Sequence, residues 1–155
     1  MGIEIERKFL VAGDDWRAVA GDGVPYRQGY LATEPERNVR VRLEGERAKL
    51  NLKSKAKGLS RAEFEYEIPR EEAEQILDGL CLRPLIEKTR YKVHRGGLVW
   101  EIDEFFGDNA GLVVAEVELE SEDQEVDLPP WVGEEVSHDH RYKNANLVSR
   151  PFSTW

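Results

Sequence analysis

Apolar and polar residues alternate along most of the chain, and a period of two predicts β-strands. Near the N-terminus, Ile3, Ile5 and Phe9 share one face of such a strand, while Glu4, Glu6 and Lys8 share the opposite face. The same alternation recurs in segments 38–44, 48–55, 63–68, 88–93, 100–103 and 116–120. The pattern therefore predicts at least seven short strands.

Turn signals lie between these segments, and helical patterns are few. Glycine marks the turns at Gly45, at residues 57–58, at residues 96–97 and at residues 107–111. A helix is expected from Pro69, which suits a first helical turn, to Gly79. Shorter helices are expected near residues 16–19 and 143–148. Strands at hairpin spacing with so few helices favour a mainly β (α+β) fold, an antiparallel sheet closed on itself or nearly so.

The length of 155 residues fits one domain covering residues 1–155. The chain has no long apolar run and no leader-like N-terminus, so we expect a soluble protein with no membrane partner. The single cysteine, Cys81, cannot form an internal disulfide, which favours a cytoplasmic location. The net charge of −9 argues against nucleic-acid binding, because nucleic-acid-binding proteins usually present a basic surface.

The charged residues are sorted by strand. The basic pairs or triplets are Arg40 and Arg42; Lys53 and Lys55; and Lys88, Arg90 and Lys92, whereas other strands carry only glutamates, such as Glu116 and Glu118. A charged face usually meets bulk water, and that interpretation suits any one strand taken alone. A solvated face usually mixes signs, however, because like charges on neighbouring strands destabilise a sheet. The sorting therefore favours a charged interior.

Such an interior has to be hydrated, because an unpaired charge in a dry barrel costs several kcal/mol. It also has to hold a ligand that needs both signs of charge. An oligophosphate with a divalent cation meets this requirement, since carboxylates bind the hard metal and basic groups bind phosphate oxygens.

The sequence resembles the CYTH superfamily, also called the triphosphate tunnel metalloenzymes. The resemblance covers nearly the whole chain and lies in Glu4-Ile5-Glu6-Arg7-Lys8-Phe9-Leu10-Val11, Gln28-Gly29-Tyr30-Leu31, Val39-Arg40-Val41-Arg42, Leu52-Lys53-Ser54-Lys55, Glu87-Lys88-Thr89-Arg90-Tyr91, Glu116-Val117-Glu118 and Arg141-Tyr142-Lys143-Asn144. It implies an eight-stranded antiparallel closed β-barrel that forms a tunnel, a triphosphate-containing substrate and a requirement for Mg²⁺ or Mn²⁺. The short chain is similar in length to the small bacterial tripolyphosphatases.

The resemblance also implies roles for individual residues. The metal ligands would be Glu4, Glu6, Glu116 and Glu118. The substrate-binding residues would be Lys8, Arg40, Arg42, Lys53, Lys88 and Arg90. Lys8 and Tyr30 resemble a catalytic pair that acts near the attacking water or the scissile phosphate. We assign Arg61 and Lys143 to surface ion pairs instead, and we expect Glu63, Glu65, Glu67, Glu101 and Asp103 to orient the basic residues through ion pairs.

The leading hypothesis is therefore metal-dependent hydrolysis of inorganic tripolyphosphate to pyrophosphate and phosphate. The same site in a nucleoside triphosphatase or an adenylate cyclase of the class IV kind is an alternative, and so is a non-catalytic module that binds polyphosphate or nucleotide. The expected partner is the small-molecule triphosphate, and a homodimer stays open.

Overall fold

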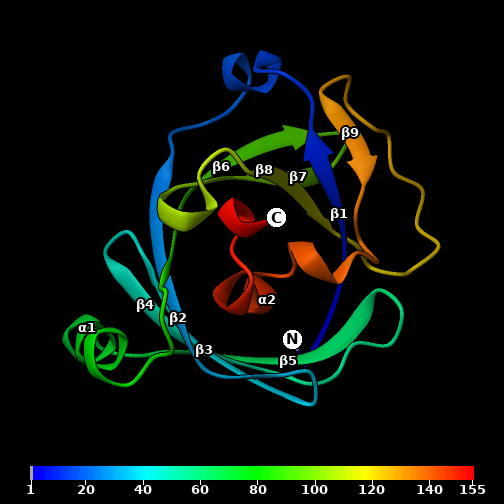
Figure 1. Cartoon of the computed structure of the whole chain (residues 1–155). Helices are drawn as coiled ribbons and strands as arrows, with labels where there is room; N and C mark the ends of the chain where they lie inside the picture. Colours follow the sequence, from blue (N-terminus) through cyan, green and yellow to red (C-terminus); the bar gives the residue numbers. More distant parts are fainter. Residues whose placement is uncertain (1) are drawn as a thin grey trace.

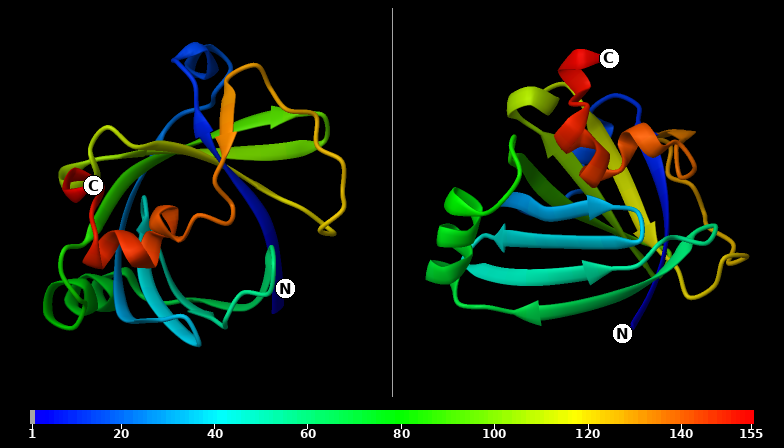
Figure 2. Two further views of the ribbon diagram at one scale, coloured as in Figure 1. Left: turned by 45° about the vertical axis from the view of Figure 1, so that its right-hand side comes forward. Right: turned by 60° about the horizontal axis from the view of Figure 1, so that its bottom comes forward.

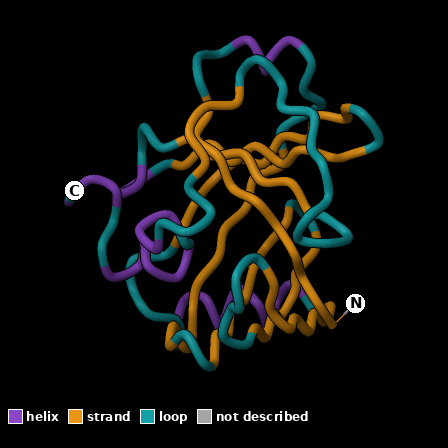
Figure 3. Tube along the Cα trace, turned by 90° about the vertical axis from the view of Figure 1, so that its right-hand side faces the viewer, coloured by secondary structure: helices purple, strands orange, loops and turns teal. Residues whose placement is uncertain are grey.

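The computed structural model describes residues 2–155 and is built mainly of β-strands. The strands are β1 (Gly2–Val11), β2 (Val24–Glu34), β3 (Arg37–Glu44), β4 (Arg47–Lys53), β5 (Ser60–Glu67), β6 (Ile86–Arg95), β7 (Leu98–Phe105), β8 (Val113–Glu118) and β9 (Val132–Glu135). Strands run through the body of the molecule in Figure 3, and the helices between them are short.

Strand β1 closes the sheet into a barrel. The strands follow the order β5-β4-β3-β2-β6-β7-β8-β1-β9, and β5 pairs with β1 as well. The first half of β1 pairs with β5 (Ile3 opposite Ala62), and its second half pairs with β8 (Lys8 opposite Glu116). Strands β1 to β8 thus form the ring seen in Figure 1, and β9 is an additional strand on the outer part of β1. The predicted eight-stranded antiparallel closed barrel is confirmed.

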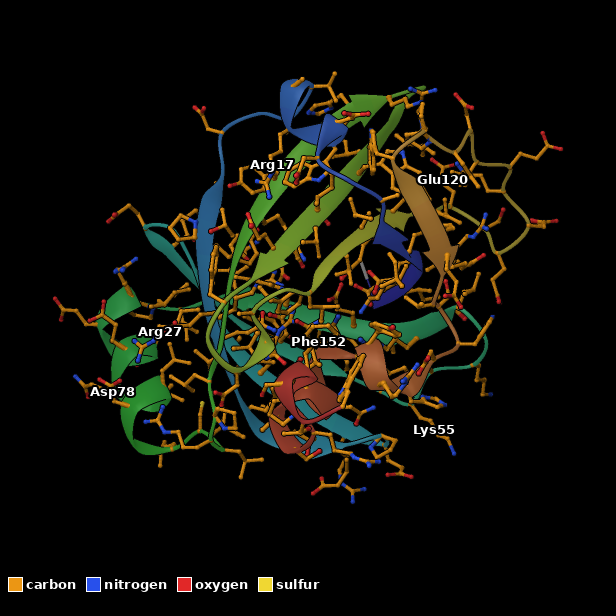
Figure 4. The ribbon with its side chains drawn as sticks, turned by 45° about the horizontal axis from the view of Figure 1, so that its top comes forward. Arg17, Arg27, Lys55, Asp78, Glu120 and Phe152 are labelled. Carbon is orange, nitrogen blue, oxygen red and sulfur yellow. The ribbon has the colours of Figure 1, made fainter. Side chains whose placement is uncertain are left out.

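Each strand presents alternate residues to the inside and the outside of this ring. On β2, the side chain of Gln28 is fully buried, while the preceding residue, Arg27, ion-pairs with Asp78 on the outside at 3.2 Å (Figure 4). On β3, Val41 and Leu43 belong to a hydrophobic cluster that excludes Arg40 and Arg42. The period-two pattern of the sequence therefore separates a polar interior from an apolar exterior.

Most of the hydrophobic core lies outside the barrel, where surrounding segments cover the apolar faces of the strands. One cluster gathers Phe9, Trp16, Trp100 and Trp131 under β9 and the short helix η1 (Asp15–Ala18). A second places Val41, Leu43 and Ala48 against the helix α1 (Arg70–Gly79) through Ala73 and Leu77, which are both fully buried. Because these apolar residues are covered from outside, most of the interior is free to remain polar.

The C-terminal region covers one end of the barrel. The short helices η3 (His140–Tyr142) and α2 (Asn144–Ser149) follow β9, and Leu147 and Val148 of α2 pack on a third cluster with Tyr30, Ile86 and Phe105. Figure 1 shows α2 within the outline of the ring, and the right-hand view of Figure 2 shows it lying across one end of the strands. The predicted helices at residues 16–19, 69–79 and 143–148 are thus present, the first as a 3₁₀ turn.

Candidate functional site

The interior of the barrel contains a cavity of about 590 Å³ that is lined mainly by charged side chains. Every residue predicted to act at the site lines this cavity: Glu4, Glu6, Lys8, Tyr30, Arg40, Arg42, Lys53, Lys88, Arg90, Glu116 and Glu118. The strands that contribute them lie on all sides of the ring. The structure thus brings together residues that are more than 100 positions apart in the sequence.

The basic residues of the cavity are nearly inaccessible to bulk solvent. Arg40 and Arg42 from β3, Lys53 from β4, and Lys88 and Arg90 from β6 are each no more than 9% exposed. Arg40 stands out because its Nε atom is buried without a hydrogen-bond partner in the described chain. An unpaired buried donor on a cation is costly unless a ligand or water satisfies it, so Arg40 is suited to bind an anion.

Asp103 on β7 holds two of these cations in place. It is fully buried; its Oδ2 atom lies 2.8 Å from Lys88 Nζ, and it accepts two hydrogen bonds from Arg90 at 2.7 and 2.8 Å. Burial lowers the pKa of Lys88 to about 8, although the nearby Asp103 carboxylate opposes this shift. The pKa of Asp103 itself is lowered because Arg90 and Lys88 outweigh the effect of burial. Lys88 is therefore a cation that can lose its proton under mildly alkaline conditions.

A second ion-pair network lies around Arg42. The Nε atom of Arg42 donates to Glu44 at 2.7 Å, and Lys49 Nζ lies 3.3 Å from Glu44 and 3.2 Å from Glu65. Asn51 also donates to Glu65 at 2.7 Å. The Arg42 guanidinium is therefore fixed along one edge by a carboxylate from its own strand.

The predicted metal ligands come from β1 and β8, which pair directly, with Glu6 opposite Glu118. Glu4 lies 3.1 Å from Lys53 and 3.4 Å from Arg61, and Glu116 lies 3.6 Å from Lys8. Among the residues that the structure describes, Glu6 makes no ion pair. Burial, together with the negative charges of Glu116 and Glu4, raises the pKa of Glu6 well above its ordinary value. Within this cluster of carboxylates, Glu6 thus has too little positive charge nearby, whereas basic neighbours outweigh burial and lower the pKa of Glu4 and of Glu116.

This cluster fits a divalent cation chemically, although it is not gathered into a ready-made metal site. Between residues 2 and 155, no three His, Cys, Asp or Glu side chains are arranged so that they could hold a metal ion as they stand. Glu4 is bound to basic neighbours instead. The donors are nevertheless hard carboxylate oxygens, and a divalent cation among them would relieve the repulsion that raises the pKa of Glu6.

Lys8 and Tyr30 lie at the end of the cavity that the C-terminal region covers. Lys8 Nζ donates to the backbone carbonyl of Tyr142 at 3.0 Å, and it lies 3.6 Å from Glu116. Tyr30 is only 2% exposed and packs in the cluster with Leu147 and Val148. The lysine is thus adjacent to the carboxylate cluster, whereas much of the tyrosine ring is held by hydrophobic packing.

Arg61 and Lys143, assigned to the surface from the sequence, line the cavity instead. Arg61 does form an ion pair, but its partner is Glu4 in the cavity wall. Burial and the charges of Arg61 and Lys8 lower the pKa of Lys143. Lys55 follows the end of β4 and is exposed at the rim, where Figure 4 shows it projecting outward. The sequence pattern does not distinguish these cases, because Lys55 and Lys143 lie outside the strands and Arg61 faces inward only through the pairing of β5 with β1.

Two uncharged residues of the cavity wall have a role that the sequence analysis did not identify. Asn144, the first residue of α2, accepts hydrogen bonds through Oδ1 from Lys88 Nζ and from Gln28 Nε2, each at 3.0 Å. Tyr26 lies in the cavity wall near Arg42 and Arg90. Neither the tyrosine of a strand nor the asparagine at the start of a helix carries a charge signal, so only the three-dimensional structure identifies these two residues.

Comparisons with known proteins agree with this geometry. The model of the CYTH domain matches residues 2–152. An inorganic triphosphatase from Acetivibrio thermocellus is 48% identical over 155 residues, which cover all of this chain and 99% of the relative. An inorganic triphosphatase from Nitrosomonas europaea is 43% identical over 94% of this chain and 96% of its own length.

Solved structures show the same fold. The crystal structure of an inorganic triphosphatase superposes with a TM-score of 0.65 at 39% identity, covering 93% of this chain and 96% of that one. A protein from Bacillus halodurans superposes with a TM-score of 0.64 over 79% of this chain and 84% of its own, but at 16% identity this likeness shows the fold alone. No helix within residues 2–155 is long and apolar enough to cross a membrane.

Proposed function

The chain belongs to the CYTH domain family, and on that premise we propose that it hydrolyses inorganic tripolyphosphate to pyrophosphate and phosphate inside the charged tunnel. The observation that carries the proposal is a cavity of about 590 Å³ inside the barrel, in which buried cations and a carboxylate cluster face the same space. A linear phosphate chain with a divalent cation needs both.

In this proposal the basic residues bind the phosphate oxygens. Arg40 offers an unpartnered donor at Nε. Further positive charge comes from strands β3, β4 and β6, through Arg42, Lys53, Lys88 and Arg90. Guanidinium groups suit phosphate because their planar fork can donate two parallel hydrogen bonds. Burial strengthens each of these contacts, since water competes less in a low-dielectric environment.

The carboxylates Glu4, Glu6, Glu116 and Glu118 would hold the divalent metal that the family implies, which we propose is Mg²⁺ or Mn²⁺. When bound, the metal would neutralise charge on the phosphate oxygens and on the leaving group. Lys8, 3.6 Å from Glu116, would add a cation beside this metal site to contact the phosphate chain. Tyr30 borders the same space and would help to place the attacking water.

Three further predictions stay untested: a cytoplasmic location, a single domain over residues 1–155 and the absence of a nucleic-acid partner. Whether the chain forms a homodimer stays open.

Product analysis tests the proposal. Purified protein is incubated with tripolyphosphate, ATP or thiamine triphosphate, with Mg²⁺, with Mn²⁺ or with a chelator, and the products are identified. We expect metal-dependent formation of phosphate and pyrophosphate from tripolyphosphate at a rate far above that from ATP. Cyclic AMP as the main product, or tight binding without turnover, would replace this function with one of the alternatives.

A matched pair of variants shows whether the tunnel performs the reaction. Arg40→Ala removes the cation whose buried Nε has no hydrogen-bond partner in the described chain, and we expect it to reduce kcat/KM at least tenfold. Arg27→Ala makes the same substitution on the outer face of β2, where Arg27 pairs with Asp78. That variant should retain wild-type kinetics, and equal losses in both variants would refute the placement of the site.

A further inference from the structure

Tyr26 lies between two arginines of the tunnel. The centre of its ring is 5.0 Å from the guanidinium carbon of Arg42 and 4.9 Å from that of Arg90. Tyr26 is on β2, which lies between β3 and β6 in the sheet, so each arginine reaches it from a neighbouring strand. The ring is 8% exposed and lines the cavity. The aromatic side chain thus contacts two cations at once.

These two arginines repel each other, and carboxylates hold part of each guanidinium group, with Glu101 also lying 3.3 Å from Nη1 of Arg90. Burial and the positive charges of Arg40 and Arg90 lower the pKa of Arg42. Glu44 binds the Nε edge of Arg42, and Asp103 binds the corresponding edge of Arg90. The ring of Tyr26 is what these two guanidinium groups share, and the electron-rich face of an aromatic ring attracts cations.

We propose that Tyr26 is a positioning residue that holds Arg42 and Arg90 at a fixed spacing and orientation for the phosphate chain. This inference rests on the proposed function, because it assigns both arginines to substrate binding. The ring fills the space between the guanidinium groups and lowers the cost of keeping two like charges close together. Their fixed orientation reduces the conformational entropy that is lost when a phosphate chain binds.

The proposed role depends on the faces of the Tyr26 ring rather than on its hydroxyl group, so a substitution that keeps the ring and one that removes it should have different effects. Tyr26→Phe keeps both faces and should retain the wild-type KM for tripolyphosphate. Tyr26→Leu keeps an apolar side chain, although a smaller one, and has no π-system, so we expect KM to rise about tenfold while kcat changes by less than about twofold. Tyr26→Met is the second ring-free variant, to be used if the leucine variant does not fold.

Tyr91→Leu is the matched control. Tyr91 lies on β6 and packs edge-on against Trp16 in the outer hydrophobic cluster, with 5.0 Å between the ring centres. Its loss should lower the melting temperature and leave KM unchanged. A purely structural role for Tyr26 predicts this same result for Tyr26→Leu, and that outcome would overturn the inference. Equal increases in KM for the phenylalanine and leucine variants would also overturn it.

Calorimetric titration of tripolyphosphate into the protein in chelator measures binding, and together with the hydrolysis assay in Mg²⁺ or Mn²⁺ it distinguishes this inference from the proposed function. If the wild type binds but does not hydrolyse tripolyphosphate, the proposed function fails, and weaker binding by Tyr26→Leu than by Tyr26→Phe still supports the positioning role. If the wild type hydrolyses it and both variants bind equally, only the positioning role fails. If the wild type neither binds nor hydrolyses it, both are refuted.

Discussion

Replacing Asp103 by asparagine should destabilise the protein strongly, because this one carboxylate compensates two buried cations. Asp103 is fully buried and contacts Lys88 and Arg90 at 2.7–2.8 Å. The amide removes the negative charge and turns one acceptor oxygen into a donor that faces a cation. Breaking a buried ion pair by removing one partner costs about 3–5 kcal/mol. For a chain of this length, that corresponds to a fall of roughly 6–20 °C in melting temperature.

The assay is urea unfolding followed by circular dichroism at pH 7, with Glu104→Gln as the control. Glu104 is the next residue on the same strand, but it pairs with Arg17 on the outer surface at 3.1 Å. An exposed pair of this kind contributes about 0–1 kcal/mol, so the control should unfold almost as the wild type does. A free energy of unfolding for Asp103→Asn within about 1 kcal/mol of the wild type would refute the reasoning.

Three other perturbations test separate parts of the site. Glu6→Gln should leave the metal-free protein at least as stable as the wild type at pH 7, because burial and its acidic neighbours raise the pKa of Glu6. The same substitution should abolish the rise in melting temperature that Mg²⁺ or Mn²⁺ produces. A metal-free variant less stable than the metal-free wild type would contradict this prediction. Because the pKa of Lys88 is about 8, this lysine binds phosphate as a cation below pH 8 and loses its charge above pH 8. The value of kcat/KM should therefore fall as the pH rises through about 8, and Lys88→Arg should remove that decline. Stability should change in the opposite direction to activity. The unfolded chain binds the Lys88 proton more tightly than the folded protein does, so the free energy of unfolding should rise between about pH 8 and 10.5. Asn144→Leu removes the acceptor shared by Lys88 and Gln28 and should cost about 1–3 kcal/mol in the urea assay, and an unchanged midpoint would show that this contact is dispensable.

The alternation of residue types predicts the barrel because its two faces differ so sharply. Strands with charges on one side and aliphatic residues on the other, such as β1 and β3, are evident from the sequence. Strand β2 is not, because its inward residues Tyr26, Gln28 and Tyr30 are uncharged and its outward residue Arg27 is charged. Strand β9 has only four residues, too few to show a period.

The candidate site was predictable as a set of residues, but its internal pairing was not. The period of two places Lys88, Arg90 and Asp103 on inward faces, yet the sequence does not give the register that sets Arg90 opposite Asp103. For the same reason it does not reveal that Tyr26 contacts arginines from two neighbouring strands. The inward position of Arg61 follows from closure between β1 and β5, which is a property of the whole barrel.

The location of the bound ligands tests the central claim most directly. Crystals of the protein grown with Mn²⁺ and a tripolyphosphate analogue whose bridging oxygens are replaced by nitrogen would give both positions in one experiment. We expect an anomalous manganese peak within bonding distance of Glu4, Glu6, Glu116 or Glu118, and phosphate density against Arg40 inside the barrel. Phosphate and manganese bound only to the outer surface, with the cavity filled by water, would contradict the account.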